Sequence, residues 1–148
     1  MTPVIGLMHL GIAVDDLRAA GQFWEGLLGR SAHGPTLIDA PRIGEIVGVP
    51  GATVEMAWID LPGAGVLELL EYDPHAVAAA GATDAGAVHI CLEVNDADSA
   101  RQAAIALGAQ PLSAGAVDVP DGPAAGSRVA YLRAPGATLI EFWERSPK

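Results

Sequence analysis

Two histidines and two glutamates stand at matching places along the chain. His9 and His89 each lie early in a strand-like stretch, and Glu68 and Glu141 each lie within a later apolar stretch. A glutamate between aliphatic and aromatic neighbours on one strand face is costly to bury unless it is paired or bound to a cation. Two imidazoles and two carboxylates suit a borderline or hard divalent transition-metal ion. The pattern therefore predicts a metal site made of these four side chains.

The histidines match because the sequence repeats itself at an offset of 80. Residues 86–100 (GAVHICLEVNDADSA) align without a gap with residues 6–20 (GLMHLGIAVDDLRAA), so that His89 falls on His9. Successive side chains of a strand point to opposite faces. The first stretch therefore places small residues such as Gly11 on the face of His9 and bulky apolar residues on the other face, under a helix.

The glutamates match through a second repeat, at an offset of 73. Residues 130–144 (AYLRAPGATLIEFWE) align with residues 57–71 (AWIDLPGAGVLELLE), so that Glu141 falls on Glu68. Two gap-free offsets, each sustained over about fifteen residues, indicate a duplicated module rather than chance agreement. The alternative is that the repeat reflects shared ancestry alone and that the four side chains never converge.

Each module is expected to contain a strand, a helix and about three further strands in a single domain, residues 1–148. The expected elements of module 1, about residues 4–72, are a helix from the N-cap Asp15 or Asp16 to Gly29, a short strand or loop at 36–38 within the irregular stretch 31–50, and a hairpin of strands 53–60 and 66–72. Residues 73–85 are expected to form a linker. Module 2, about residues 86–145, is expected to repeat the strand, a helix that ends near Gly108, and a hairpin.

The composition argues against several classes of partner. The net charge of −10 argues against nucleic acid or an anionic membrane as the main partner. No apolar run is long enough to span a bilayer, and the N-terminus lacks the basic region of a signal peptide. The single cysteine, Cys91, excludes an intramolecular disulfide, which is compatible with the reducing cytoplasm. We therefore expect a cytoplasmic protein whose partner is a small molecule.

The repeated segments resemble a known superfamily. The module order, the strands MHLGIAVDDL and VHICLEVND, and the two PGA-x-x-x-E endings are similar to the vicinal oxygen chelate superfamily. That superfamily includes glyoxalase I, methylmalonyl-CoA epimerase, extradiol dioxygenases and the fosfomycin and bleomycin resistance proteins. The resemblance covers nearly the whole chain and is weakest over residues 31–51. It implies an α+β fold of two tandem βαβββ modules whose sheets curl into a cup around a metal ion.

The resemblance places the family's metal ligands on His9, Glu68, His89 and Glu141, and it implies one divalent ion, which could be Zn, Ni, Co, Mn or Fe. Four protein ligands on a six-coordinate ion leave two adjacent positions open. Two positions are enough to chelate the paired oxygens of an enediolate or a thioester enolate. We therefore expect an isomerase or lyase that removes a proton next to the carbonyl group of a small carbonyl compound or acyl thioester.

Two other functions stay open at this point. Oxygen-activating sites prefer two histidines and one carboxylate, so an Fe(II)-dependent dioxygenase of the extradiol type requires that Glu68 lies near the metal without binding it. A non-enzymatic drug-binding protein of the bleomycin-resistance kind usually lacks the metal ligands, so the intact set counts against that function. The resemblance also implies a homodimer.

Within the superfamily, the strongest resemblance is to methylmalonyl-CoA epimerase, and it suggests two catalytic carboxylates. Glu55 falls where some epimerases of this kind carry a catalytic carboxylate. In glyoxalase I the base is a metal-bound glutamate, which corresponds here to Glu141 or Glu68. Epimerisation needs a proton acceptor on one face of the carbon and a donor on the other, so Glu55 and Glu141 form the expected pair. The alternative for Glu55 is a solvent-facing carboxylate on a strand.

The two remaining histidines and the apolar lining of the cup are not expected to bind the metal. His33 and His75 lie in loop-like stretches, and we expect them to be solvated. We expect substrate specificity to reside in the lining of the cup, formed by Leu70, Trp143 and the loop-like segment 117–127.

Overall fold

The computed structural model describes residues 6–38, 42–63, 65–73, 81, 83 and 87–146. The chain divides into two compact units, Met1–Val77 and Ala78–Lys148. Each unit combines a mixed sheet with helices, which confirms the predicted α+β fold of two modules. His75 and most of the predicted linker at 73–85 lie outside the described residues. No helix in the described ranges is long and apolar enough to cross a membrane.

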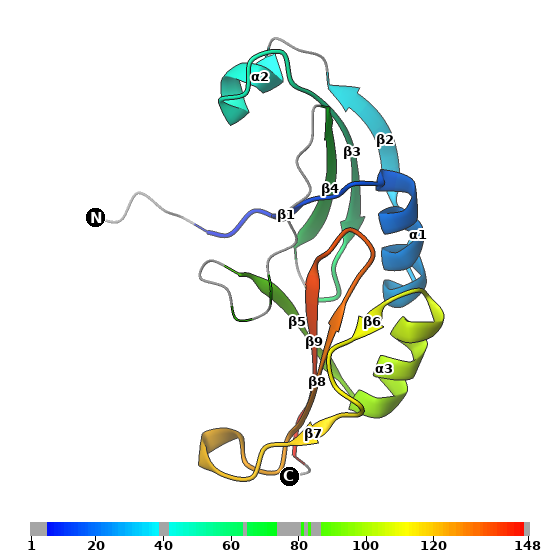
Figure 1. The fold of residues 1–148 in the computed structure, drawn as a ribbon, viewed down its shortest axis with the longest axis vertical. Helices are drawn as coiled ribbons and strands as arrows, with labels where there is room; N and C mark the ends of the chain where they lie inside the picture. The colour runs from blue at the N-terminus through cyan, green and yellow to red at the C-terminus, as the bar shows by residue number, and fades with distance from the viewer. Residues whose placement is uncertain are drawn as a thin grey trace, which may run out of the picture. The chain divides into compact units, whose positions relative to one another are not determined.

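Unit 1 is a four-stranded sheet with a long helix on one face (Figure 1). Its elements are β1 (Leu10–Ala13), α1 (Leu17–Leu28), β2 (His33–Ile38), α2 (Arg42–Val47), β3 (Thr53–Asp60) and β4 (Val66–Asp73). The strand order is β1-β4-β3-β2, with β1 parallel to β4 and the other neighbours antiparallel. The predicted hairpin is confirmed, whereas β1 is shorter than the repeated segment.

Helix α1 begins and ends where the sequence predicts. The Asp16 side chain accepts a hydrogen bond from the Ala19 N–H at 2.8 Å. Gly29 ends the helix with a φ of 63°, in the left-handed region that favours glycine. The buried side of the helix, which includes Phe23 and Trp24, packs on one face of β3 and β4. Alternation along these strands leaves every second side chain on the other face of the sheet.

The stretch 31–50, predicted to be irregular, contains more regular structure than its sequence suggests. A register shift between His33 and Thr36 interrupts the pairing of β2 with β3, at a proline that an edge strand tolerates. Helix α2 contains Gly44, where a Cβ would lie 2.8 Å from the Val49 carbonyl oxygen. A strand at 36–38 was one of the two expected structures, and β2 extends it back to His33, whereas α2 was not predicted because glycine usually interrupts a helix.

Unit 2 repeats this plan around a second mixed sheet (Figure 1). Its elements are β5 (His89–Val94), α3 (Ala97–Ala106), β6 (Gln110–Pro111), β7 (Val117–Asp118), the 3-10 helix η1 (Gly122–Ala124), β8 (Arg128–Arg133) and β9 (Leu139–Glu144). The strand order is β5-β9-β8-β6, β7 also pairs with β8, and β5 is parallel to β9. The predicted helix is confirmed, with the Asp96 side chain accepting from the Ser99 N–H at 2.6 Å.

A glutamate on the last strand of each unit accepts a hydrogen bond from the start of α1 or α3. In unit 1 the Leu17 N–H donates to Glu71 Oε2 at 2.7 Å. In unit 2 the Ala97 N–H donates to Glu144 Oε2 at 2.8 Å. The first N–H groups of a helix lack partners within the helix and carry a positive partial charge, so a carboxylate there is stabilising. These contacts tie the last strand of each unit to the helix that follows its first strand.

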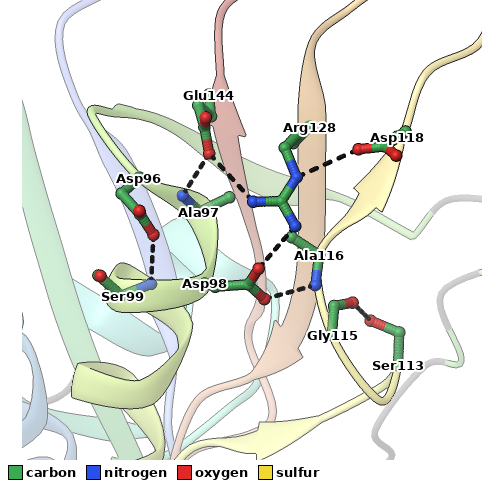
Figure 2. A network of polar contacts seen from close by, with 10 residues as sticks. All are labelled: Asp96, Ala97, Asp98, Ser99, Ser113, Gly115, Ala116, Asp118, Arg128 and Glu144. Carbon is green, nitrogen blue, oxygen red and sulfur yellow. Dashed lines mark hydrogen bonds and ion pairs between the residues drawn. The ribbon is translucent and has the colours of Figure 1, made fainter.

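Unit 2 adds an ion-pair network around Arg128, drawn in Figure 2. The Arg128 guanidinium lies 2.6 Å from Asp98, 3.1 Å from Asp118 and 3.7 Å from Glu144. Asp98 also accepts a hydrogen bond from the Ala116 N–H at 2.9 Å. The Ala116 N–H and the Arg128 guanidinium together hold the pKa of Asp98 below its usual range. The network joins α3 to β7, β8 and β9.

Removal of the N-cap side chains tests the assignment of the helix starts. We expect Asp16→Ala and Asp96→Ala each to lower the free energy of unfolding by about 1 kcal/mol, because each leaves a helix N–H without its partner. Asp15→Ala is the matched control, since Asp15 is exposed and is not the N-cap of α1. Urea unfolding followed by circular dichroism measures the effect. Equal losses in all three variants would contradict the capping assignment.

The Arg128 network predicts a dependence of stability on pH. The pKa of Asp98 is lowered from 3.8 in the folded protein, so its stabilising contribution is present above that value and is lost as the pH falls through the folded pKa. We expect Asp98→Asn to unfold at a lower urea concentration than the wild type near neutral pH, and the difference to shrink below about pH 4. Asp118→Asn is the control and should have a smaller effect near neutral pH, since its carboxylate is 82% exposed against 45% for Asp98. A difference that stays constant into acid would contradict this role of Asp98.

Candidate metal centre

In unit 1, strand pairing places His9 beside Glu68. Gly11 pairs with Glu68 on the parallel strands β1 and β4, and Trp58 pairs with Glu68 on the antiparallel strands β3 and β4. Residues that pair across a sheet share a face, and this face is opposite the one that packs on α1. His9 precedes β1 by one residue, and its Nε2 lies 3.4 Å from Glu68 Oε2. Two of the four predicted ligands are thus brought together.

Unit 2 builds the same pair in the same register. Cys91 pairs with Glu141 on β5 and β9, and Tyr131 pairs with Glu141 on β8 and β9. His89 Nε2 lies 3.1 Å from Glu141 Oε2. These pairings stand at the positions of unit 1 shifted by the sequence offsets of 80 and 73. The duplication therefore extends from the sequence to the strand register and to the contact between imidazole and carboxylate.

The geometry of both pairs fits the donors of a divalent metal ion. Two ligand atoms about 2.1 Å from one ion, at right angles to each other, lie about 3.0 Å apart. The nitrogen–oxygen distances in the two pairs are 3.4 and 3.1 Å. Within each unit, the part that the structure describes contains no group of three or more histidine, cysteine, aspartate or glutamate side chains that could hold a metal ion. The described part of each unit therefore contributes one histidine–glutamate pair of possible donors.

The two carboxylates differ in their surroundings. The Glu141 side chain is 10% exposed, against 21% for Glu68. Tyr131 lies beside Glu141, with its hydroxyl 3.3 Å from His89 Nε2 and the two rings edge to face. Burial and the Glu141 carboxylate raise the pKa of Tyr131, and they raise the pKa of the Cys91 thiol to about 11. Both groups therefore stay protonated at neutral pH and can donate to Glu141.

The matching positions in unit 1 leave Glu68 more room. Gly11 carries no side chain, and a Cβ built there would lie 3.9 Å from Glu68 Oε2 and 4.0 Å from the His9 ring. Trp58 occupies the position of Tyr131 and carries no hydroxyl group. Glu68 therefore lacks the hydroxyl and thiol donors that surround the carboxylate of unit 2.

A comparison with protein-family models decides the family. Residues 8–131 match the Glyoxalase/Bleomycin resistance protein/Dioxygenase superfamily. The chain belongs to this superfamily. The match confirms the resemblance to the vicinal oxygen chelate superfamily that the repeated segments suggested. Members typically bind a divalent metal ion, and the superfamily contains many enzymes as well as non-enzymatic proteins.

Several solved structures share the fold. A glyoxalase family protein from Bacillus cereus aligns with a TM-score of 0.80 at 22% identity, covering 99% of this chain and 97% of that chain. A glyoxylase/bleomycin resistance protein/dioxygenase domain from Frankia sp. EAN1pec aligns with a TM-score of 0.66 at 16% identity, covering 96% and 93%. TioX from Micromonospora sp. ML1 aligns with a TM-score of 0.57 at 19% identity, covering 95% and 98%. No curated protein matches the chain. At these identities the likeness establishes the glyoxalase-like fold alone.

The register of β3 against β4 places Glu55 away from the His9–Glu68 pair. Glu55 pairs with Glu71, whose carboxylate accepts from the Leu17 N–H at the start of α1. Alternation along β4 puts Glu71 and Glu68 on opposite faces, so Glu55 lies on the face opposite Glu68. The prediction that Glu55 is catalytic finds no support in this placement, and its exposed carboxylate fits the alternative of a solvent-facing residue.

The structure adds side chains to this face that the sequence interpretation missed. His33, expected to be a solvated loop residue, is the first residue of β2 and pairs with Trp58. The repeat could have identified Trp58 and Tyr131, because the offset of 73 aligns these two aromatic residues. Leu70 and Trp143, predicted to line the cup, lie two residues beyond the glutamates along β4 and β9, on the same faces and partly buried.

Proposed function

We propose that this superfamily member is a metal-dependent isomerase or lyase that removes a proton next to the carbonyl group of a small carbonyl compound or an acyl thioester. The histidine–glutamate pair in each unit, built twice in one register, is the observation that supports it. His9, Glu68, His89 and Glu141 would hold one divalent ion. Bound there, the ion would act as a Lewis acid that stabilises negative charge on the substrate's oxygens.

Glu141 is the proposed base. A base must lie within hydrogen-bond distance of the proton that it takes, and a neighbouring donor can return a proton to the product. Next to Glu141 lie the Tyr131 hydroxyl and the Cys91 thiol, so the carboxylate that accepts the proton has donors beside it. Glu68 lacks those neighbours, and we assign it the role of a metal ligand.

Metal binding tests the proposal directly. We expect the purified protein, stripped with a chelator and titrated with zinc, to bind about one ion per chain. His9→Ala and His89→Ala should each weaken zinc binding at least about tenfold, because each removes a ligand. His33→Ala is the matched control, since His33 lies on the face of Glu68 but stacks on Trp58. Isothermal titration calorimetry measures the affinities.

Metal analysis of protein purified without added metal distinguishes the proposed function from the two alternatives. Zinc, nickel, cobalt or manganese near one ion per chain supports an isomerase or lyase. Bound iron together with O2 uptake on catechols would establish a dioxygenase instead. Absence of bound metal, with no loss of stability on adding a chelator, would contradict the metal site and favour a drug-binding protein.

Replacement of the two carboxylates identifies the base. The measurement is deuterium incorporation from D2O, followed by NMR, into methylmalonyl-CoA and into the glutathione hemithioacetal of methylglyoxal. The substrate to use is the one whose acidic proton the wild type exchanges for deuterium. With that substrate, Glu141→Gln should lower the exchange rate by a factor of about 100 or more. Glu68→Gln, loaded with metal, should retain exchange and serves as the isosteric control. The reverse result would make Glu68 the base.

A further inference from the structure

One row of side chains crosses the sheet of unit 1 on the face of Glu68. His33 pairs with Trp58, Trp58 pairs with Glu68, and Glu68 pairs with Gly11, beside His9. Neighbouring strands lie about 4.8 Å apart, so the backbone of Trp58 is about 5 Å, and that of His33 about 10 Å, from the backbone of Glu68 across the sheet. The row therefore runs from a polar pair at β1 and β4 to an aromatic pair at β3 and β2.

The two aromatic rings of this row are stacked and partly accessible. The ring centroids of His33 and Trp58 lie 5.8 Å apart with an angle of 24° between the planes, which is a stacked arrangement. Trp58 is 36% exposed, and His33 is exposed as well. Trp24, by contrast, is completely buried in the core of the same unit. An indole left partly open beside a polar pair offers a face on which another ring can stack.

Apolar side chains continue this surface along the strands. Met56 pairs with Leu70, one step beyond the row on the same face. Farther along, Ile43 of α2 packs with Val54, and Leu70 and Tyr72 pack partly buried against them. The surface next to the polar pair is thus aromatic across the strands and apolar along them. A ligand that fits it has a polar end and an unsaturated or apolar body.

Duplication does not explain the stacked rings. In unit 2 the position of Trp58 is taken by Tyr131, whose hydroxyl points to His89 and whose ring meets the imidazole edge to face, with the planes at 66°. The strand beside Tyr131 is the two-residue β6, where Pro111 pairs with Leu132. The open stacked surface is therefore a feature of unit 1, which suits a ligand with one aromatic group to one side of its polar end.

We propose that Trp58 and His33 bind an aromatic ring attached directly to the substrate's carbonyl carbon, so that the preferred substrates are aryl carbonyl compounds. The inference rests on the proposed function, in which the substrate's oxygens bind an ion that His9 and Glu68 help to hold. A ring bonded to the carbonyl carbon lies about one strand spacing from those oxygens, which is the separation of Trp58 from Glu68. A short aliphatic acyl group in the same place would leave the indole uncovered.

The stacked pair Trp58 and His33 is called the aromatic platform below. Two small chelating probes test it, one with a methyl group and one with a phenyl group on the carbonyl carbon. Acetohydroxamate and benzohydroxamate carry the same paired oxygens, and only the second carries a phenyl group. We expect the zinc-loaded wild type to bind benzohydroxamate about tenfold more tightly. Trp58→Ala should reduce this preference to less than about twofold and His33→Ala should weaken it, while acetohydroxamate affinity stays unchanged. Leu37→Ala is the control, because Leu37 is exposed on β2 and pairs with Glu55, on the opposite face.

A second readout separates failure of the platform from failure of the proposed function. The indole N–H signal of Trp58, assigned by its loss in Trp58→Ala, is followed by 15N NMR while benzohydroxamate is added to metal-free protein. A shift of this signal that acetohydroxamate does not produce supports the platform, even where zinc adds no affinity and the proposed function fails. Equal preference in the wild type and Trp58→Ala, or no shift of the Trp58 signal, would overturn the platform.

Discussion

Each unit depends on the parallel pairing of its first strand with its last strand. The register that sets Gly11 against Glu68, and Cys91 against Glu141, places each histidine within contact of a carboxylate. A slip of one residue would turn every side chain of the first strand to the other face, under the helix. The same last strands also present the glutamates that accept from the first N–H groups of α1 and α3. The two contacts therefore hold the register at both ends of the strand pair.

Duplication made much of this predictable from the sequence. The four residues of the two pairs were found because two offsets aligned them, and equivalent residues fold into equivalent registers. The start of α1 followed from its aspartate cap. The sequence left the stretch 36–38 open between strand and loop, and it missed the start of β2 and all of α2. Gly44 and the proline of β2, residues that usually interrupt regular structure, serve a close backbone approach and an edge strand here. His33 was assigned to a loop for the same reason, although it is exposed as expected.

Glu55 shows what a sequence pattern leaves undetermined. Its place in a strand was correct, but the face that it occupies depends on the register of β3 against β4, which pairs it with Glu71. Unit 2 carries Arg128 at the equivalent position, paired with Glu144 and bound to Asp98 at the start of α3. In both units this position belongs to the face on which the helix packs. The side chains next to the glutamates differ between the units, by contrast: Tyr131 and Cys91 offer proton donors to Glu141, whereas Trp58 and Gly11 offer none to Glu68.

The proposed function requires that His9 and His89 bind the same metal ion. Long-range 1H–15N NMR of the imidazole nitrogens measures this directly, during titration of metal-free protein with zinc. We expect the Nε2 signals of His9 and His89 to move together and to stop moving at about one equivalent of zinc, while those of His33 stay in place. Movement of only one of the two histidines, or successive movement that requires two equivalents, would contradict it.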